Sequence, residues 1–224
     1  MLFLRTTDKD GRAHGGFQWP LEVGAEVIAP DWDPKPACGG GLHGLLDGLG
    51  ESMHLSFDAD AIWWIVEADE TVDLGGKHKF PRCKVVAFGP RHEVTAHLHG
   101  LRPGPIQGLC LTGGYRSTLT GGDGSTLTGG DWSTLTGGYR STLTGGDWST
   151  LTGGDGSTLT GGDGSTLTGG YRSTLTGGYR STLIFLRWID GRRRVLTAYV
   201  GEDGIEPGVA YRASDDFKSV VRAS

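Results

Sequence analysis

Polar and apolar positions alternate most regularly between residues 107 and 186, where Ser-Thr-Leu-Thr-Gly-Gly returns every eight residues. In an extended backbone successive side chains point to opposite faces, so Ser and Leu share one face and the two threonines the other. β-branched threonine at alternate positions favours a strand. Gly-Gly is expected to give the backbone freedom for a tight corner. Each octad therefore predicts one short strand followed by one turn.

Ten octads follow one another along this segment. The first, residues 107–114, is degenerate, and the nine regular units begin at Tyr115, Asp123, Asp131, Tyr139, Asp147, Asp155, Asp163, Tyr171 and Tyr179. A repeat this short cannot bury its apolar face alone and must stack on its neighbours. Two octads closing on each other make a 16-residue coil, so the segment predicts a β-solenoid of about five coils. Its expected core ladder is Leu111, Leu119, Leu127, Leu135, Leu143, Leu151, Leu159, Leu167 and Leu175.

Two other interpretations of the repeat are open. Glycine-rich segments are often flexible linkers, but a linker needs no leucine and threonine at a fixed register. The fragment GGDG is similar to the calcium-binding β-roll, which needs a period of nine with a regular aspartate. Here the period is eight, and Tyr-Arg replaces the acid in four units.

The flanking segments have ordinary composition and predict two further domains. Residues 1–105 are expected to form an α+β domain, with strands at 61–66 and 85–88 and a helix at 91–98. In residues 187–224, apolar runs flank Asp190-Gly191, which is a hairpin signal. This tail is expected to cap the solenoid, whose open edge would otherwise recruit other chains. The first domain is an expected cap for the other end. The fold class is mainly β.

Charge and cysteine content narrow the function classes. A net charge of -5 gives no reason to expect a nucleic-acid partner. The start, MLFLRTTDKDGR, lacks the apolar core of a secretion signal, and no apolar run is long enough to span a bilayer. The default expectation is a cytoplasmic protein without a transmembrane segment. Three widely spaced cysteines do not make a disulfide framework.

A glycine-rich run in the first domain, Cys38 to Gly44, contains residues that could bind a metal or act as a nucleophile. Cys38 with His43, and His78 with Cys83, are acceptable zinc ligands, but both spacings are looser than in standard fingers. A Cys-His nucleophile would need an orienting third group, and none stands out. We expect a tight loop with His43 packed beneath it, no enzyme activity, no catalytic residue, no bound metal and no cofactor.

The octads GGYRSTLT and GGDGSTLT resemble the tandem repeats of bacterial ice nucleation proteins. The tail adds to this resemblance, since residues 181–185, Trp188, residues 190–192 and residues 201–204 look like that family's C-terminal cap. The likeness covers residues 107 to about 212. Glycine replaces the family's alanine, the array is far shorter, and residues 1–105 do not look like the family's N-terminal domain.

The resemblance implies that the threonine pairs form ice-binding grids. Spacings of about 6.7 Å along a strand and about 4.8 Å between coils would give flat arrays of hydroxyl and methyl groups. One grid would hold Thr126, Thr128, Thr142, Thr144, Thr158, Thr160, Thr174 and Thr176. The other would hold Thr118, Thr120, Thr134, Thr136, Thr150, Thr152, Thr166 and Thr168. The alternative is that threonine only stabilises exposed strands through cross-strand pairs.

The two variable residues of each octad predict a second kind of site. Units 16 residues apart should stack, which places Asp155 beside Arg140 and Arg172 and puts three aspartates in succession. In the resembled family, arginine-bearing coils near the C-terminus serve fibre assembly. The assembly residues expected here are Arg116, Arg140, Arg172, Arg180, Trp132 and Trp148. Simple surface charge and a structural aromatic ladder are the alternatives.

Together these patterns predict an ice-binding or ice-nucleating protein that orders water on threonine grids and associates with itself. Its expected partner is ice or ordered water, and the resemblance adds surface association to the cytoplasmic default. The alternative function is a structural, self-assembling solenoid whose N-terminal domain carries an unidentified binding function.

Overall fold

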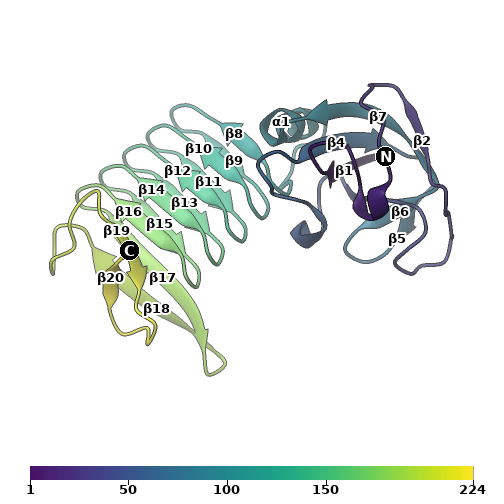
Figure 1. Ribbon diagram of the computed structural model, residues 1–224. Helices are drawn as coiled ribbons and strands as arrows, with labels where there is room; N and C mark the ends of the chain where they lie inside the picture. Colours follow the sequence, from purple (N-terminus) through teal and green to yellow (C-terminus); the bar gives the residue numbers. More distant parts are fainter. Residues whose placement is uncertain (224) are drawn as a thin grey trace. The chain divides into compact units, whose positions relative to one another are not determined.

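The computed structural model of the protein describes residues 1–223, which form two compact units divided after Cys110. Each unit folds around its own strands (Figure 1). The expected boundary between solenoid and C-terminal cap at residues 186/187 lies inside the second unit and stays a prediction, and Ser224 lies outside the described residues. Among residues 1–223 no helix has the length and apolar character needed to cross a membrane.

The first unit is an antiparallel sheet of seven strands with one α-helix. The strands are β1 (Leu2–Thr7), β2 (Glu26–Ile28), β3 (Leu42–Leu46), β4 (Ile62–Glu67), β5 (Val72–Asp73), β6 (His78–Phe80) and β7 (Arg82–Gly89), in the order β2-β7-β4-β1-β3-β6-β5. The helix α1 (Arg91–Leu101) follows β7, and short 3₁₀ turns lie at His14–Gly16 and Ser52–His54. The predicted strands at 61–66 and 85–88 match β4 and β7, and the predicted helix is α1.

The central strands β1 and β4 are buried along most of their length, which gives this unit its apolar core. Phe3 on β1, Trp64 on β4 and Phe80 on β6 are completely buried in one cluster. Val94 and Leu98 of α1 are also buried. The glycine run is a tight loop, as expected, because Gly39, Gly40 and Gly41 all have positive φ. The Cβ of any other residue at 40 would lie 2.7 Å from the Asp31 carbonyl oxygen.

The second unit is the predicted β-solenoid, in which short strands alternate between two parallel sheets (Figure 1). One sheet holds β8 (Cys110–Thr112), β10 (Thr126–Thr128), β12 (Thr142–Thr144), β14 (Thr158–Gly161) and β16 (Thr174–Gly177). The other holds β9 (Thr118–Thr120), β11 (Thr134–Gly137), β13 (Thr150–Gly153), β15 (Thr166–Gly169) and the start of β17 (Thr182–Ile189). The mainly β fold with about five coils of 16 residues is confirmed.

The predicted leucine ladder is the core of the solenoid. Leucines 127, 135, 143, 151, 159, 167 and 175 are completely buried, and Leu183 of β17 extends the row. Leu111 and Leu119, in the first coil, are partly exposed because no coil of this unit precedes them. Serines 125 to 181 of the octads share the interior with the leucines, as the alternation predicts.

Antiparallel strands cover the last coil. β17 continues past the sheet and folds back on β18 (Arg192–Tyr199), and Asp190 and Gly191 both have positive φ, as a two-residue hairpin turn requires. On the other sheet, β19 (Ala210–Ala213) pairs with β16 and then with β20 (Val220–Arg222). Both sheets therefore end on a strand contributed by the tail.

Candidate functional site

The outer surface of the coils consists of two threonine rows that we call face A and face B. Face A is carried by β10, β12, β14 and β16, where each threonine is paired with the threonine 16 residues on, from Thr126↔Thr142 to Thr160↔Thr176. Face B is carried by β9, β11, β13 and β15, with pairs from Thr118↔Thr134 to Thr152↔Thr168. These rows contain the same residues as the two predicted grids.

The threonines point outward while the leucine between them points inward. In β11 to β14 every threonine is exposed, and the neighbouring Leu135, Leu143, Leu151 and Leu159 are fully buried. Threonines of β10, β15 and β16 are partly exposed. Because the parallel strands are in register, the hydroxyl and methyl groups of each face repeat along the stack with the spacing of the strands, about 4.8 Å.

Buried serines hold the coils in this register. The Ser149 hydroxyl accepts a hydrogen bond from the Ser133 N–H at 3.2 Å and donates one to the Gly130 carbonyl at 3.2 Å. The same pair of bonds is made by the hydroxyl of Ser157, between Ser141 N–H and the Gly138 carbonyl. A satisfied buried ladder of this kind fixes each coil on the one before it.

Removing one rung of the serine ladder should destabilise the solenoid. Ser149→Ala leaves the buried Ser133 N–H without its partner, which should lower the free energy of unfolding by about 1–3 kcal/mol. The neighbouring exposed change Thr150→Ala should lower it by less than about 1 kcal/mol. Urea unfolding followed by β-sheet circular dichroism measures both. Equal midpoints for the two variants would mean that the serine ladder contributes nothing.

The expected role of Gly-Gly at the corner is wrong. In the nine regular units the residue with positive φ is the second residue of the octad: Arg116, Gly124, Trp132, Arg140, Trp148, Gly156, Gly164, Arg172 and Arg180. The Gly-Gly pair is needed for close approach instead. A Cβ at Gly137 would lie 2.6 Å from the Ser141 Cβ, and one at Gly154 would lie 2.8 Å from the Gly138 carbonyl carbon of the preceding coil.

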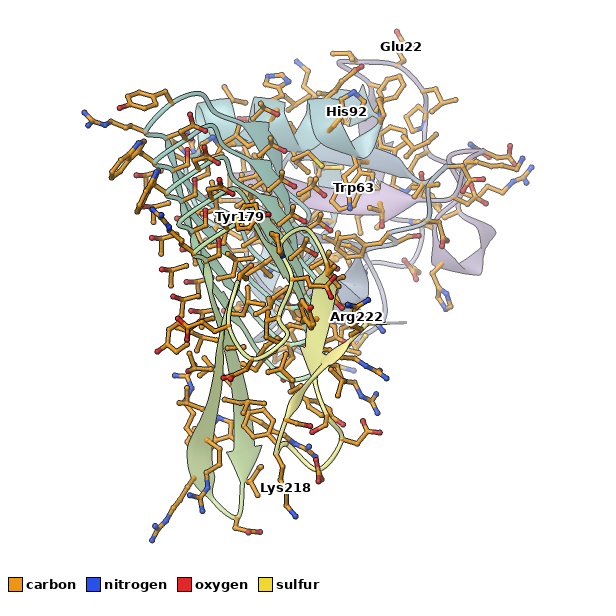
Figure 2. All side chains as sticks on the ribbon, turned by 90° about the vertical axis from the view of Figure 1, so that its left-hand side faces the viewer. Glu22, Trp63, His92, Tyr179, Lys218 and Arg222 are labelled. Atoms are coloured by element: carbon orange, nitrogen blue, oxygen red, sulfur yellow. The ribbon has the colours of Figure 1, made fainter. Side chains whose placement is uncertain are left out.

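The variable residues form two columns along the edges of the stack. One column reads Tyr115, Asp131, Asp147, Asp163 and Tyr179, and the other reads Asp123, Tyr139, Asp155 and Tyr171. Tyr179, labelled in Figure 2, is 62% exposed at the end of the first column. The six predicted assembly residues all lie beside these columns, at the second octad position.

The aspartates of the columns do not form the expected contacts with arginines. Among the ion pairs of residues 1–223, none joins Asp155 to Arg140 or Arg172. The Asp155 carboxylate accepts the Tyr171 N–H of the next coil at 2.7 Å. The backbone donor is nearer and already positioned, so the carboxylate is used to join coils.

The same hydrogen bond accounts for three successive aspartates. Asp131 accepts the Asp147 N–H at 3.0 Å, and Asp147 accepts the Asp163 N–H at 2.8 Å. These charge-assisted bonds offset the repulsion expected between the stacked carboxylates. This ladder was missed from the sequence, although an aspartate at the first position of five octads was a usable signal.

The arginines lie over tyrosine rings. The guanidinium carbons of Arg116, Arg140 and Arg172 are 5.0–5.1 Å from the ring centroid of the tyrosine that precedes each of them. Arg187 lies 4.7 Å from the Tyr171 ring, a contact not foreseen from the sequence. In the column that begins at Tyr115, Trp132 and Trp148 stack at 5.7 Å with an interplanar angle of 17°. Both tryptophans are half exposed, so this edge carries an aromatic surface.

The four zinc-ligand candidates of the first unit do not form a centre. Within residues 1–223 no three His, Cys, Asp or Glu side chains are grouped so as to hold a metal ion. Cys38 is exposed while Cys83 is buried among apolar side chains, and burial raises the pKa of the Cys83 thiol to about 12. The described residues therefore do not bring these four side chains together as a set of metal ligands.

Known proteins similar to this chain share its repeats. An ice nucleation protein of Xanthomonas campestris pv. translucens is 46% identical over 107 residues, which are 46% of this chain and 7% of that protein. Ice nucleation proteins of Pseudomonas syringae and Pseudomonas fluorescens are 49% and 34% identical over 108 and 102 residues. The repeat region of the chain is similar to the ice nucleation proteins.

This finding confirms the resemblance for the repeat-bearing half alone. The matches cover 44–46% of this chain and only 7–9% of the length of these ice nucleation proteins. No family model matches the chain, and no solved structure does. The N-terminal unit must therefore be interpreted from its own residues.

Proposed function

We propose that this protein binds ice through the threonine faces of its solenoid and promotes or shapes ice growth. The observation that carries the proposal is the register of faces A and B, in which outward threonine pairs repeat without interruption over fully buried leucines. The similarity of the repeats to those of ice nucleation proteins supports the same function.

The chemistry of the faces suits a water layer better than a solute. Each threonine offers one hydroxyl, which can donate and accept, and one methyl group on a stiff χ1 angle. Positions two apart on a strand are separated by about 6.7 Å, and neighbouring coils by about 4.8 Å. Because the side chains are already fixed, such a lattice can order a water layer with little loss of side-chain entropy.

The length of the stack limits what one molecule does. Five coils extend about 24 Å at about 4.8 Å each, which is enough to engage an ice plane but small for nucleating one. A single chain should therefore shape ice crystals or nucleate ice weakly. Assemblies of several chains should nucleate ice at warmer temperatures. Freezing of droplets that contain the purified full chain tests this function against buffer alone.

We further propose that the edge residues Arg116, Arg140, Arg172, Arg180, Trp132 and Trp148 associate with other copies of the chain. At six of nine octads a non-glycine side chain occupies the left-handed conformation, which glycine occupies in the other three. Such a conformation costs about 1 kcal/mol or more for a residue with a Cβ. An arginine or tryptophan kept there at a cost in stability is consistent with a use outside the fold.

Assembly through these arginines should weaken as salt rises, because exposed charges are screened over about 8–10 Å at physiological ionic strength. We expect the particle size of the full chain, measured by analytical ultracentrifugation, to fall between low and high sodium chloride. Changing Arg116, Arg140, Arg172 and Arg180 to glycine should give the small species at all salt concentrations.

The glycine variant carries its own control. Glycine relieves the positive φ at each site, so the solenoid should be as stable as the parent or more stable by up to about 1 kcal/mol per site. A smaller particle size in this variant then cannot result from unfolding of the solenoid. A size that is independent of salt and unchanged in the variant would reduce the arginines to ordinary surface charge.

A structural solenoid that assembles without touching ice is the second candidate. It is favoured by the edge aromatics alone, namely the Trp132–Trp148 stack and the exposed tyrosines. Freezing separates the two functions, because this one predicts association of the chain without any effect on the freezing of droplets.

A further inference from the structure

Arg5 lies on β1 in the N-terminal unit with its guanidinium buried and no carboxylate beside it. The residue is 9% exposed, and its carbon Cζ is 3.7 Å from the centroid of the Trp19 ring. One nitrogen, Nη1, donates to the His43 carbonyl at 3.3 Å, while Nε has no hydrogen-bond partner among the described residues. A buried charge is costly unless it is paired.

Neighbouring side chains supply no counter-charge. Burial lowers the pKa of Arg5 to about 9, so the guanidinium remains protonated at neutral pH. Cys83 lies near it, but burial raises the pKa of that thiol to about 12 and keeps it neutral. His43 has its pKa lowered to about 4, mainly by burial, so it is neutral as well. The positive charge of Arg5 is left unmatched.

Arg5 lines a cavity of about 760 Å³ within this unit, a size typical of small-molecule sites. The cationic lining residues are Arg5 and Lys77, and the one carboxylate is Asp31, whose Oδ1 accepts the Gly41 N–H at 3.0 Å. Trp19 also lines it and leaves its indole Nε1 without a partner. Phe17, Leu42 and Leu55 add apolar walls.

We propose that this cavity binds a small organic anion, with its carboxylate or phosphate paired to Arg5 and its apolar body against Phe17, Trp19 and Leu55. A guanidinium fork matches either group. Trp19 adds an unpaired indole donor, and Lys77 adds a second positive charge at the cavity. The N-terminal unit is thus a ligand-binding module, independent of the threonine faces.

Titration of the full chain with three matched probes tests the proposal. Benzoate and phenyl phosphate carry the anion on the same ring, and benzamide has nearly the same shape without charge. The readout is the indole N–H resonance of Trp19 in a ¹⁵N-labelled protein, assigned with a Trp19→Phe variant. We expect saturable shifts with benzoate or phenyl phosphate by about 10 mM, and none with benzamide. The stronger of the two anions identifies the headgroup.

Three variants test whether the anion binds to Arg5. Arg5→Gln should weaken binding of the preferred anion at least about tenfold, as expected for a lost hydrogen bond to a charged group. Lys77→Gln should weaken it by a smaller factor, and Lys35→Gln, an exposed cation outside the cavity, should leave it unchanged. If Arg5→Gln does not fold, the affinity of Lys77→Gln and the comparison with benzamide still test whether the cavity binds an anion. Benzamide binding as well as benzoate, unchanged affinity in Arg5→Gln or Lys77→Gln, or no saturation by either anion would overturn the proposal.

Discussion

Replacing Thr134, Thr136, Thr150 and Thr152 with lysine should remove the ice activity of face B while the solenoid stays folded. The four side chains are exposed on β11 and β13, and Leu135 and Leu151 beneath them are untouched. Exposed substitutions cost about 0.5 kcal/mol or less each. Four flexible ammonium groups would interrupt the lattice at its centre, and ordering of the water layer is cooperative, so the loss should be nearly complete if this face binds ice.

The matched variant on face A separates the two surfaces. Thr142, Thr144, Thr158 and Thr160 are the equivalent exposed positions of β12 and β14. The morphology of single ice crystals grown in each protein solution is the measurement. Loss in one variant identifies the ice face, and partial loss in both means that the faces act together. Full activity in both folded variants would make the threonines structural, with cross-strand pairing as their role.

Removal of residues 187–224 should make the chain aggregate. β18 covers the edge of β17, and β19 covers the edge of β16, so the truncation exposes the backbone donors and acceptors of both sheets. An open parallel edge is a template for further strands. We expect most of the truncated protein to be lost from solution or to elute as large aggregates in size-exclusion chromatography with light scattering.

A point variant tests the same covering role more gently. Tyr211 on β19 is 2% exposed, and its hydroxyl accepts the Glu206 N–H at 2.8 Å. Tyr211→Ala should lower the free energy of unfolding by about 3–5 kcal/mol, as for other large core residues. Arg193→Ala on the exposed β18 is the matched control. A truncated protein that stays monomeric with an unchanged unfolding midpoint would contradict the capping role of the tail.

The repeat was predictable because one pattern decides several properties at once. Alternation alone puts Ser141 and Leu143 inside and Thr142 outside, and the period of eight then fixes Thr142 opposite Thr158. Side chains that compete for partners were less predictable. Asp155 had arginines and a backbone N–H within the same stack, and the sequence does not show that the N–H is the closer partner.

The glycine assignment failed for a related reason. Gly137 and Gly138 were interpreted through backbone freedom, whereas their lack of a Cβ is what the adjoining coils require. Glycine at the second octad position, in Gly124, Gly156 and Gly164, was the true signal of positive φ. The cavity at Arg5 was beyond sequence reasoning, since Trp19 and His43 come to it from separate segments whose pairing has no local pattern.

Freezing of supercooled droplets shows whether the threonine faces act on ice. The samples are the full chain, its two four-threonine lysine variants and buffer, at equal protein concentration and low salt. We expect droplets with the full chain to freeze at a warmer median temperature than buffer droplets. At least one lysine variant should return that temperature to the buffer value while remaining folded. A full chain that freezes with the buffer and leaves ice crystals unshaped would contradict it.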